Sequence, residues 1–223
     1  MTMCAADPHL LIELSYGYAN RPCRSTPPCG DGAAWIASET ISWLLVLDAI
    51  GHGPIANRIA RLLLSTFSEI VQSSTQKAIA IDEVVEQLHT TLINRRLDEQ
   101  AAISLYRFDH VKGSAEMLAI GNLETYVIRP QGMTSLNSQN GMVGGRIPKT
   151  LHKQSIALSD NTVLAVFSDG ISSREFRDGL GKYVYGPFSK RELAETARIL
   201  VQSFHRDYDD ASCALVRVRR ISS

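Results

Sequence analysis

The sequence predicts an α+β protein in which antiparallel sheets are covered by helices packed outside them. Segments with strand character occur in runs, and a pair of helices is inserted after the third strand. A parallel α/β protein would instead alternate strands and helices along the whole chain. The length of 223 residues suits one large domain, so residues 1–223 are expected to form a single domain.

The first half of the chain is expected to contain three strands and then two helices. The first strand is predicted at residues 10–14, and residues 33–37 and 43–47 form a strand pair across a polar turn. Apolar residues at helical spacing then predict helices at residues 54–72 and 81–92. The segment 43–47 is apolar throughout, which is typical of a strand buried on both faces.

In the second half the period changes to that of strands, with one more helix near the end. Turn signals at Lys112-Gly113 and Gly121-Asn122 separate the first three of these strands. The strands are predicted at residues 103–108, 115–119, 125–128, 154–158, 163–167 and 212–218. The helix is predicted at residues 190–204, where apolar residues align on one face.

The composition excludes some classes of partner. Lys plus Arg and Asp plus Glu number 23 each, so no basic excess is available to neutralise the phosphates of a nucleic acid. No apolar run approaches the roughly 20 residues of a membrane helix, and the N-terminus lacks the pattern of a secretory signal. We therefore expect a cytoplasmic protein that binds neither nucleic acid nor membrane. Its cysteines, Cys4, Cys23, Cys29 and Cys213, are expected to be reduced thiols.

Acidic residues stand where predicted strands begin or end. Asp48 follows the apolar run 43–47 and leads through a turn with two glycines into a helix. The other points of this kind are Asp31, Asp169 and the pair Asp209-Asp210. A charge at the lip of an apolar core is costly unless something pairs with it, and Mg²⁺ and Mn²⁺ prefer carboxylate ligands. These residues could therefore converge on a metal at one edge of a sheet sandwich.

Each of these residues also has a simpler interpretation. Asp169-Gly170 is a common hairpin turn, Asp31 could be an ordinary turn residue, and Asp209-Asp210 could merely end a loop. The set of four points, and not any single residue, favours a metal site.

Several short motifs resemble the metal-dependent Ser/Thr protein phosphatases of the PPM type. The resemblance is to their bacterial SpoIIE-like branch, and within it to the RsbX family of small stand-alone phosphatases. The motifs are Cys29-Gly30-Asp31, the turn Asp48–Gly53 with Pro54-Ile55-Ala56, Glu99-Gln100-Ala101-Ala102, Gly121-Asn122-Leu123-Glu124, Asn140–Gly144, Phe167-Ser168-Asp169-Gly170 and Asp209-Asp210-Ala211-Ser212. They extend over nearly the whole chain.

The resemblance implies an αββα sandwich, which is two antiparallel sheets flanked by helices, with two Mn²⁺ or Mg²⁺ ions at one end. By position, Asp48 would bridge both ions and the carbonyl of Ala49 would complete the shell of one. Asp169 and Asp209 would hold the other ion, and Asp31 would contribute directly or through water. Asp210 is the alternative to Asp209.

Two departures from the family pattern concern the geometry of this site. The branch usually has Gly after the bridging Asp, whereas this chain has Ala49, whose dihedral angles are more restricted. The segment 30–35 around Asp31 is longer than usual.

The implied reaction is attack on phosphorus by a water that both ions activate, without a covalent phosphoenzyme. His52, in the same turn as Asp48, could protonate the leaving group, although a loop histidine without a chemical role is the simpler interpretation. No arginine is assigned to hold the phosphate.

The implied substrates are phosphorylated STAS-domain proteins of a bacterial stress-signalling system, either a stressosome scaffold or an anti-sigma-factor antagonist. The alternative is a phosphoprotein-binding module of the same fold with weak or no turnover, which Ala49 favours. Two other phosphatase patterns fail on context. Cys213 and Arg219 have Cys-x₅-Arg spacing but enclose a strand-like segment, and Asp207-x-Asp209 precedes the last strand instead of following an early one.

Overall fold

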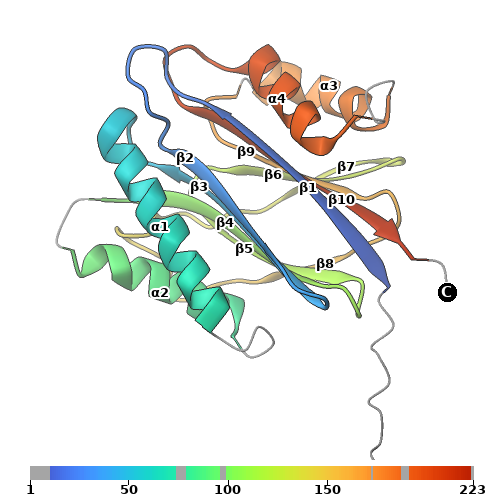
Figure 1. Ribbon diagram of the computed structural model, residues 1–223, viewed down its shortest axis with the longest axis horizontal. Helices are drawn as coiled ribbons and strands as arrows, with labels where there is room; N and C mark the ends of the chain where they lie inside the picture. Colours follow the sequence, from blue (N-terminus) through green and yellow to red (C-terminus); the bar gives the residue numbers. More distant parts are fainter. Residues whose placement is uncertain (1–10, 74–78, 96–98, 172, 187–190, 222–223) are drawn as a thin grey trace, which may run out of the picture.

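The computed structural model describes residues 11–73, 79–95, 99–171, 173–186 and 191–221. Two five-stranded sheets face each other, and a pair of helices covers the outer side of each (Figure 1). All strand pairs in both sheets are antiparallel. The predicted α+β class and αββα sandwich are confirmed.

The first sheet has the strand order β1-β10-β9-β6-β7 and contains both the first and the last strand of the chain. Its strands are β1 (Ile12–Arg21), β6 (Glu124–Arg129), β7 (Gly132–Leu136), β9 (Val163–Phe167) and β10 (Ala211–Arg220). Helices α3 (Ser173–Tyr185) and α4 (Leu193–Phe204) cover it.

The second sheet has the order β2-β3-β4-β5-β8. Its strands are β2 (Asp31–Ala37), β3 (Ile41–Ala49), β4 (Ala101–Asp109), β5 (Ser114–Ile120) and β8 (Gln154–Ala157). Helices α1 (Gly53–Ser73) and α2 (Ile81–Ile93) pack on its outer face. No helix among the described residues is long and apolar enough to span a membrane.

The central part of β3, residues 43–47, is apolar at every position because it lies between two cores. Trp43, Leu45 and Leu47 belong to the core between this sheet and helices α1 and α2. Leu44 and Val46 belong to the core between the two sheets. Because consecutive side chains of a strand point to opposite faces, a strand inside two cores needs apolar residues on both.

Strand β1 is longer than predicted and extends from Ile12 to Arg21 instead of ending at residue 14. Gly17 interrupts the apolar pattern because the N-terminal end of α4 crosses the strand there. A Cβ atom on Gly17 would lie 2.2 Å from the backbone nitrogen of Ala194. Glycine therefore marks a close approach between helix and strand, not the end of the strand.

Two elements were not predicted. Strand β7 is short and mostly exposed, so it lacks the alternation that marks a half-buried strand. Helix α3 contains two glycines and many polar residues, and its buried residues Phe176, Leu180 and Val184 form a narrow stripe. The predicted helix 190–204 is α4, which begins at Leu193, and residue 190 lies outside the described residues.

Candidate metal centre

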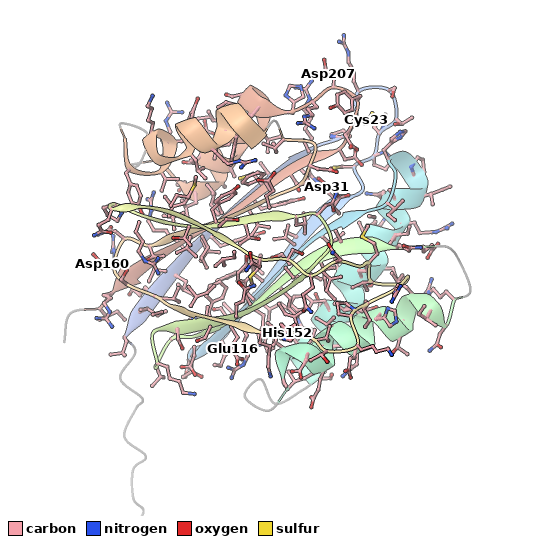
Figure 2. The ribbon with its side chains drawn as sticks, turned by 180° about the vertical axis from the view of Figure 1, so that it is seen from behind. Cys23, Asp31, Glu116, His152, Asp160 and Asp207 are labelled. Atoms are coloured by element: carbon pink, nitrogen blue, oxygen red, sulfur yellow. The ribbon has the colours of Figure 1, made fainter. Side chains whose placement is uncertain are left out.

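The acidic points of the sequence come from one edge of the sandwich, where strands of both sheets begin or end. Asp31, the first residue of β2, is paired in register with Asp48 near the end of β3. In the other sheet, the residues after β9 lie beside the start of β10, since the Ser168 amide donates to the carbonyl of Ser212 (3.2 Å). Figure 2 labels Asp31 at this edge and Asp160 at the opposite end of the molecule. We call this the metal edge, defined by Asp31, Asp48, Asp169 and Asp209.

Asp31 joins the two sheets through its carboxylate. The Ser168 hydroxyl donates to Asp31 Oδ2 (2.6 Å), and the Ser212 amide donates to Ser168 Oγ (2.9 Å). Asp31 is only 4 % exposed, and its other oxygen, Oδ1, is buried without a hydrogen-bond partner. Burial raises the pKa of Asp31 to about 7, against the hydrogen bonds from Ser168 and Ser212, which favour the ionised form. An unpaired buried carboxylate oxygen is costly, so this site needs a proton or a cation.

Asp48 is affected by every other carboxylate of the metal edge. Burial raises its pKa to about 9, and the charges of Asp31, Asp169 and Asp209 add to the increase. Like charges that lie close together disfavour each other's ionised form, so Asp31, Asp169 and Asp209 each lie near enough to Asp48 to repel its charge. A divalent cation among them would remove the repulsion.

Asp169 and Asp209 lie in the loops next to β9 and β10. Asp169 is exposed and accepts a hydrogen bond at Oδ2 from the side-chain amide of Asn122 (2.8 Å). Asp209 is partly buried, and burial together with the charge of Asp169 raises its pKa. The glycine after Asp169 is required by packing, because a Cβ atom on Gly170 would lie 1.9 Å from the carbonyl oxygen of Asp210.

Asp210 differs from Asp209 because both of its carboxylate oxygens accept backbone amides, whereas only Oδ1 of Asp209 does, from the Asp210 amide (2.9 Å). It is buried, and its oxygens accept the amides of Cys23 (2.6 Å) and Gly30 (2.5 Å). These bonds fix the loop before β2 to the start of β10. The structure thus favours Asp209 over Asp210 as the carboxylate available to a metal.

Asp210 also belongs to a compact group with Cys29 and Asp31, whose candidate ligand atoms all lie within 4.8 Å of one another. Burial and the charge of Asp31 raise the pKa of the Cys29 thiol, so the thiolate form that binds metals is disfavoured. Because both Asp210 oxygens already accept amides, we regard this group as part of the packing beneath the metal edge.

Ala49 is compatible with the backbone at its position. It is buried at the end of β3, in register with Ala101 of β4. Among the described residues, Asn161 is the only non-glycine with a positive φ, so Ala49 adopts no conformation that requires glycine. The left-handed residues of this turn are Gly51 and Gly53.

His52 lies in the same turn and is exposed. Its Nδ1 atom is hydrogen-bonded to the Thr26 hydroxyl at 2.6 Å. The charge of His52 lowers the pKa of Asp209, so the two side chains are within electrostatic range. His52 is therefore placed beside the metal edge with a ring orientation set by Thr26.

Three supporting residues, Asn122, Ser168 and Ser212, stand in motifs named above, but the sequence assigned them no role. Ser168 interrupts an apolar run just before Asp169, and Ser212 follows the acidic pair at the start of β10. Besides these motifs, the signal for Ser168 and Ser212 is a polar residue at the end of a buried strand.

The structure excludes Cys213 as the nucleophile of a cysteine-dependent phosphatase, the alternative raised by its Cys-x₅-Arg spacing to Arg219. Cys213 is fully buried within β10, paired with Ala19 on one side and Phe167 on the other, so no anion-binding loop follows it. Cys23, Cys29 and Cys213 are free thiols, and Cys4 lies outside the described residues.

Comparisons with solved structures agree with this fold. A chain solved in work on the bacterial stressosome, described as a modular system adapted to control secondary messenger signalling, superposes with a TM-score of 0.78 and 22 % identity over 92 % of this chain and 100 % of its own. RsbX, crystallised in complex with magnesium, gives 0.73 and 14 % over 94 % of this chain and 99 % of its own.

The PP2C phosphatase domain of SpoIIE from Bacillus subtilis, solved with a fragment of its regulatory domain, gives a TM-score of 0.79 and 18 % identity. The match covers 96 % of this chain and 65 % of that one. No curated protein matches the sequence significantly. A family model described as Stage II sporulation protein E (SpoIIE) matches residues 39–219. The chain therefore belongs to the SpoIIE family, and its fold is that of the PP2C-type phosphatases.

Proposed function

We propose that the chain is a metal-dependent protein serine/threonine phosphatase that uses two divalent cations, Mn²⁺ or Mg²⁺. The observation that carries this proposal is the set of carboxylates at the metal edge. Asp31 Oδ1 is buried without a partner, and the pKa of its register neighbour Asp48 is raised by burial and by three other carboxylates. Family membership and fold support a phosphatase, and the magnesium bound to RsbX supports the choice of a hard cation.

In this proposal the cations would be held by the carboxylates of Asp48, Asp31, Asp169 and Asp209 together with the carbonyl of Ala49. Bound divalent cations supply two kinds of chemistry, a lowered pKa for a shared water and neutralisation of phosphoryl charge.

The chain's own residues orient this site. The Ser168 hydroxyl donates to Asp31 Oδ2, so Asp31 Oδ1 is left without a hydrogen-bond partner and is available to a cation. The Asn122 side-chain amide orients Asp169 in the same way. His52, exposed and held by Thr26, is the proposed donor of a proton to the departing serine or threonine oxygen.

We further propose that the substrates are phosphorylated STAS-domain proteins, a stressosome scaffold or an anti-sigma-factor antagonist, in the cytoplasm. The support is the similarity in fold to RsbX and to the chain from the stressosome work. The test is release of phosphate from a phosphorylated STAS-domain protein, compared with an unrelated phosphoserine protein.

The activity itself is tested by Mn²⁺-dependent hydrolysis of p-nitrophenyl phosphate. Asp48→Asn should reduce turnover by about 100-fold or more, because it removes the charge shared by both cations. Asp160→Asn, at the opposite end of the molecule, is the matched control and should leave turnover unchanged. Equal turnover by the wild type and Asp48→Asn would contradict the proposal. No turnover by either protein, with no metal bound, would favour the phosphoprotein-binding module.

A further inference from the structure

A basic loop begins at the metal edge. We define it as residues 138–153, which connect β7 to β8 and contain Arg146, Lys149, His152 and Lys153. Residues 125–159 contain no Asp or Glu, although acidic and basic residues are equally frequent in the whole chain. Charge is thus segregated, with carboxylates at the metal edge and cations on the adjoining loop.

The first part of the basic loop is fixed to the metal edge by backbone hydrogen bonds. The Gly121 amide donates to Gln139 O (2.9 Å), and Gly121 precedes Asn122, the partner of Asp169. Val143 and Ala101 exchange two hydrogen bonds of 2.9 and 3.0 Å. Because Ala101 of β4 is also in register with Ala49, the basic loop borders β4 on the side opposite β3, one strand away from the turn that follows Asp48.

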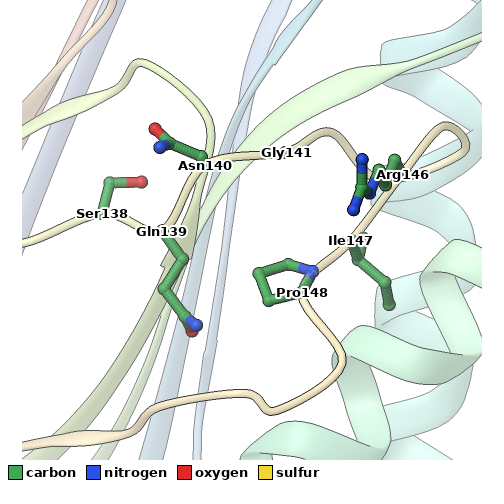
Figure 3. A pocket seen from close by; sticks show the side chains of 7 residues that line it. All are labelled: Ser138, Gln139, Asn140, Gly141, Arg146, Ile147 and Pro148. Atoms are coloured by element: carbon green, nitrogen blue, oxygen red, sulfur yellow. The ribbon is translucent and has the colours of Figure 1, made fainter.

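A pocket of about 580 Å³ lies in this loop, lined by residues 138–141 and 146–148 (Figure 3). The side-chain amide of Gln139 already has partners. Its Nε2 donates to the carbonyl of Thr150, and its Oε1 accepts a hydrogen bond from the backbone amide of His152. Asn140 and Arg146 are exposed, and among the described residues no hydrogen bond or ion pair occupies either side chain. The pocket therefore offers a guanidinium and an amide to a ligand with acceptor oxygens.

Lys149, three residues after Arg146, is also exposed and has no ion pair among the described residues, whereas Lys153 pairs with Asp82 of α2. The pocket has no aromatic lining residue, so it lacks the stacking surfaces that bind single-stranded nucleic acid. These properties favour a carboxylate-bearing protein segment over a nucleic acid.

We infer that the basic loop binds an acidic segment of the phosphoprotein substrate, next to its phosphorylated residue, through Arg146 and Lys149. This inference rests on the proposed function, because a phosphorylated side chain at the metal edge brings its flanking residues over the neighbouring loop. Complementary charges at the rim of an interface act on encounter rate and on selectivity, so the loop would select among phosphoproteins.

The test is the binding of two fluorescently labelled phosphoserine peptides, one flanked by Glu and one by Gln, measured by anisotropy at low salt. The wild type should bind the Glu peptide about tenfold more tightly, and Arg146→Gln with Lys149→Gln should abolish this difference. Arg219→Gln with Arg220→Gln removes the same charge from the exposed end of β10 and should preserve it. Equal binding of both peptides by the wild type, or an unchanged preference in the Arg146/Lys149 variant, would overturn the inference. Tighter binding of an oligonucleotide than of the Glu peptide would also overturn it.

Turnover of p-nitrophenyl phosphate separates this inference from the proposed function. This small ester has no flanking residues, so the Arg146/Lys149 variant should hydrolyse it at the wild-type rate. A selective peptide preference without any hydrolysis would sustain the basic loop as a docking site and contradict the phosphatase proposal. Hydrolysis without a peptide preference would sustain the phosphatase proposal and contradict the docking site on the basic loop.

Discussion

Asp209 and Asp210 are adjacent in the sequence but differ in what their carboxylates contact. Asp210 is buried and accepts two backbone amides, whereas Asp209 is partly buried and its pKa responds to Asp169. The sequence shows only two acidic residues before a strand. Which of them faces the metal edge depends on the path of the segment around residues 23–30, which supplies the amides for Asp210.

Substitution of these two residues should separate stability from metal binding. Asp210→Asn replaces one acceptor oxygen with an amide that faces a backbone N–H, so we expect a loss of about 2–3 kcal/mol in the free energy of unfolding. Asp209→Asn should change stability little and weaken Mn²⁺ binding. Urea denaturation and calorimetric titration with Mn²⁺ measure the two effects. The opposite pattern would make Asp210 the metal ligand.

The secondary-structure prediction is confirmed where a strand or helix has a strong apolar pattern. Residues 163–167 were predicted as a strand and form β9, and the helices predicted at 54–72 and 81–92 are α1 and α2. It failed for α3, where polar residues hide a narrow apolar stripe, and for the second half of β1, where Gly17 serves a contact with a helix far along the chain. A contact of this kind has no local signal.

Two glycines, Gly17 of β1 and Gly181 of α3, give a test of this interpretation. Gly17→Ala should destabilise the protein by about 1–3 kcal/mol, because the new methyl group collides with the backbone of α4. Gly181→Ala, within α3, meets no atom within 4 Å and should stabilise the protein by about 0.5–1 kcal/mol through helix propensity. Both are measured by thermal or urea denaturation. Similar effects at both positions would show that the α4 contact does not require glycine at residue 17.

At the scale of the whole molecule, the sandwich brings carboxylates of both sheets to one edge. The sequence predicted this convergence because the carboxylates stand at four strand ends, and the resemblance to the phosphatase family implied which carboxylate would serve which cation. It could not supply the supporting contacts, such as the bond from Ser168 to Asp31 that crosses between the sheets, because these depend on how the two sheets face each other.

The convergence of carboxylates should make stability depend on pH in the metal-free protein. Burial raises the pKa of Asp31 to about 7 and that of Asp48 to about 9, from an ordinary value of 3.8. Between the ordinary pKa of 3.8 and the raised values of about 7 and 9, the folded state binds more protons than the unfolded state. The free energy of unfolding therefore falls as pH rises through this window. Urea denaturation in a chelator should show lower stability at about pH 8 than at about pH 5, and a smaller difference in Asp48→Asn. A rise in stability over the same interval would contradict the raised pKa values.

Anomalous diffraction from crystals soaked in Mn²⁺ shows whether the metal edge binds two cations. We expect two peaks about 3.5–4 Å apart, with Asp48 between them and Asp169 and Asp209 beside one. A crystal without anomalous density at this edge, or with a single peak at Cys29, Asp31 and Asp210, would contradict a two-cation site.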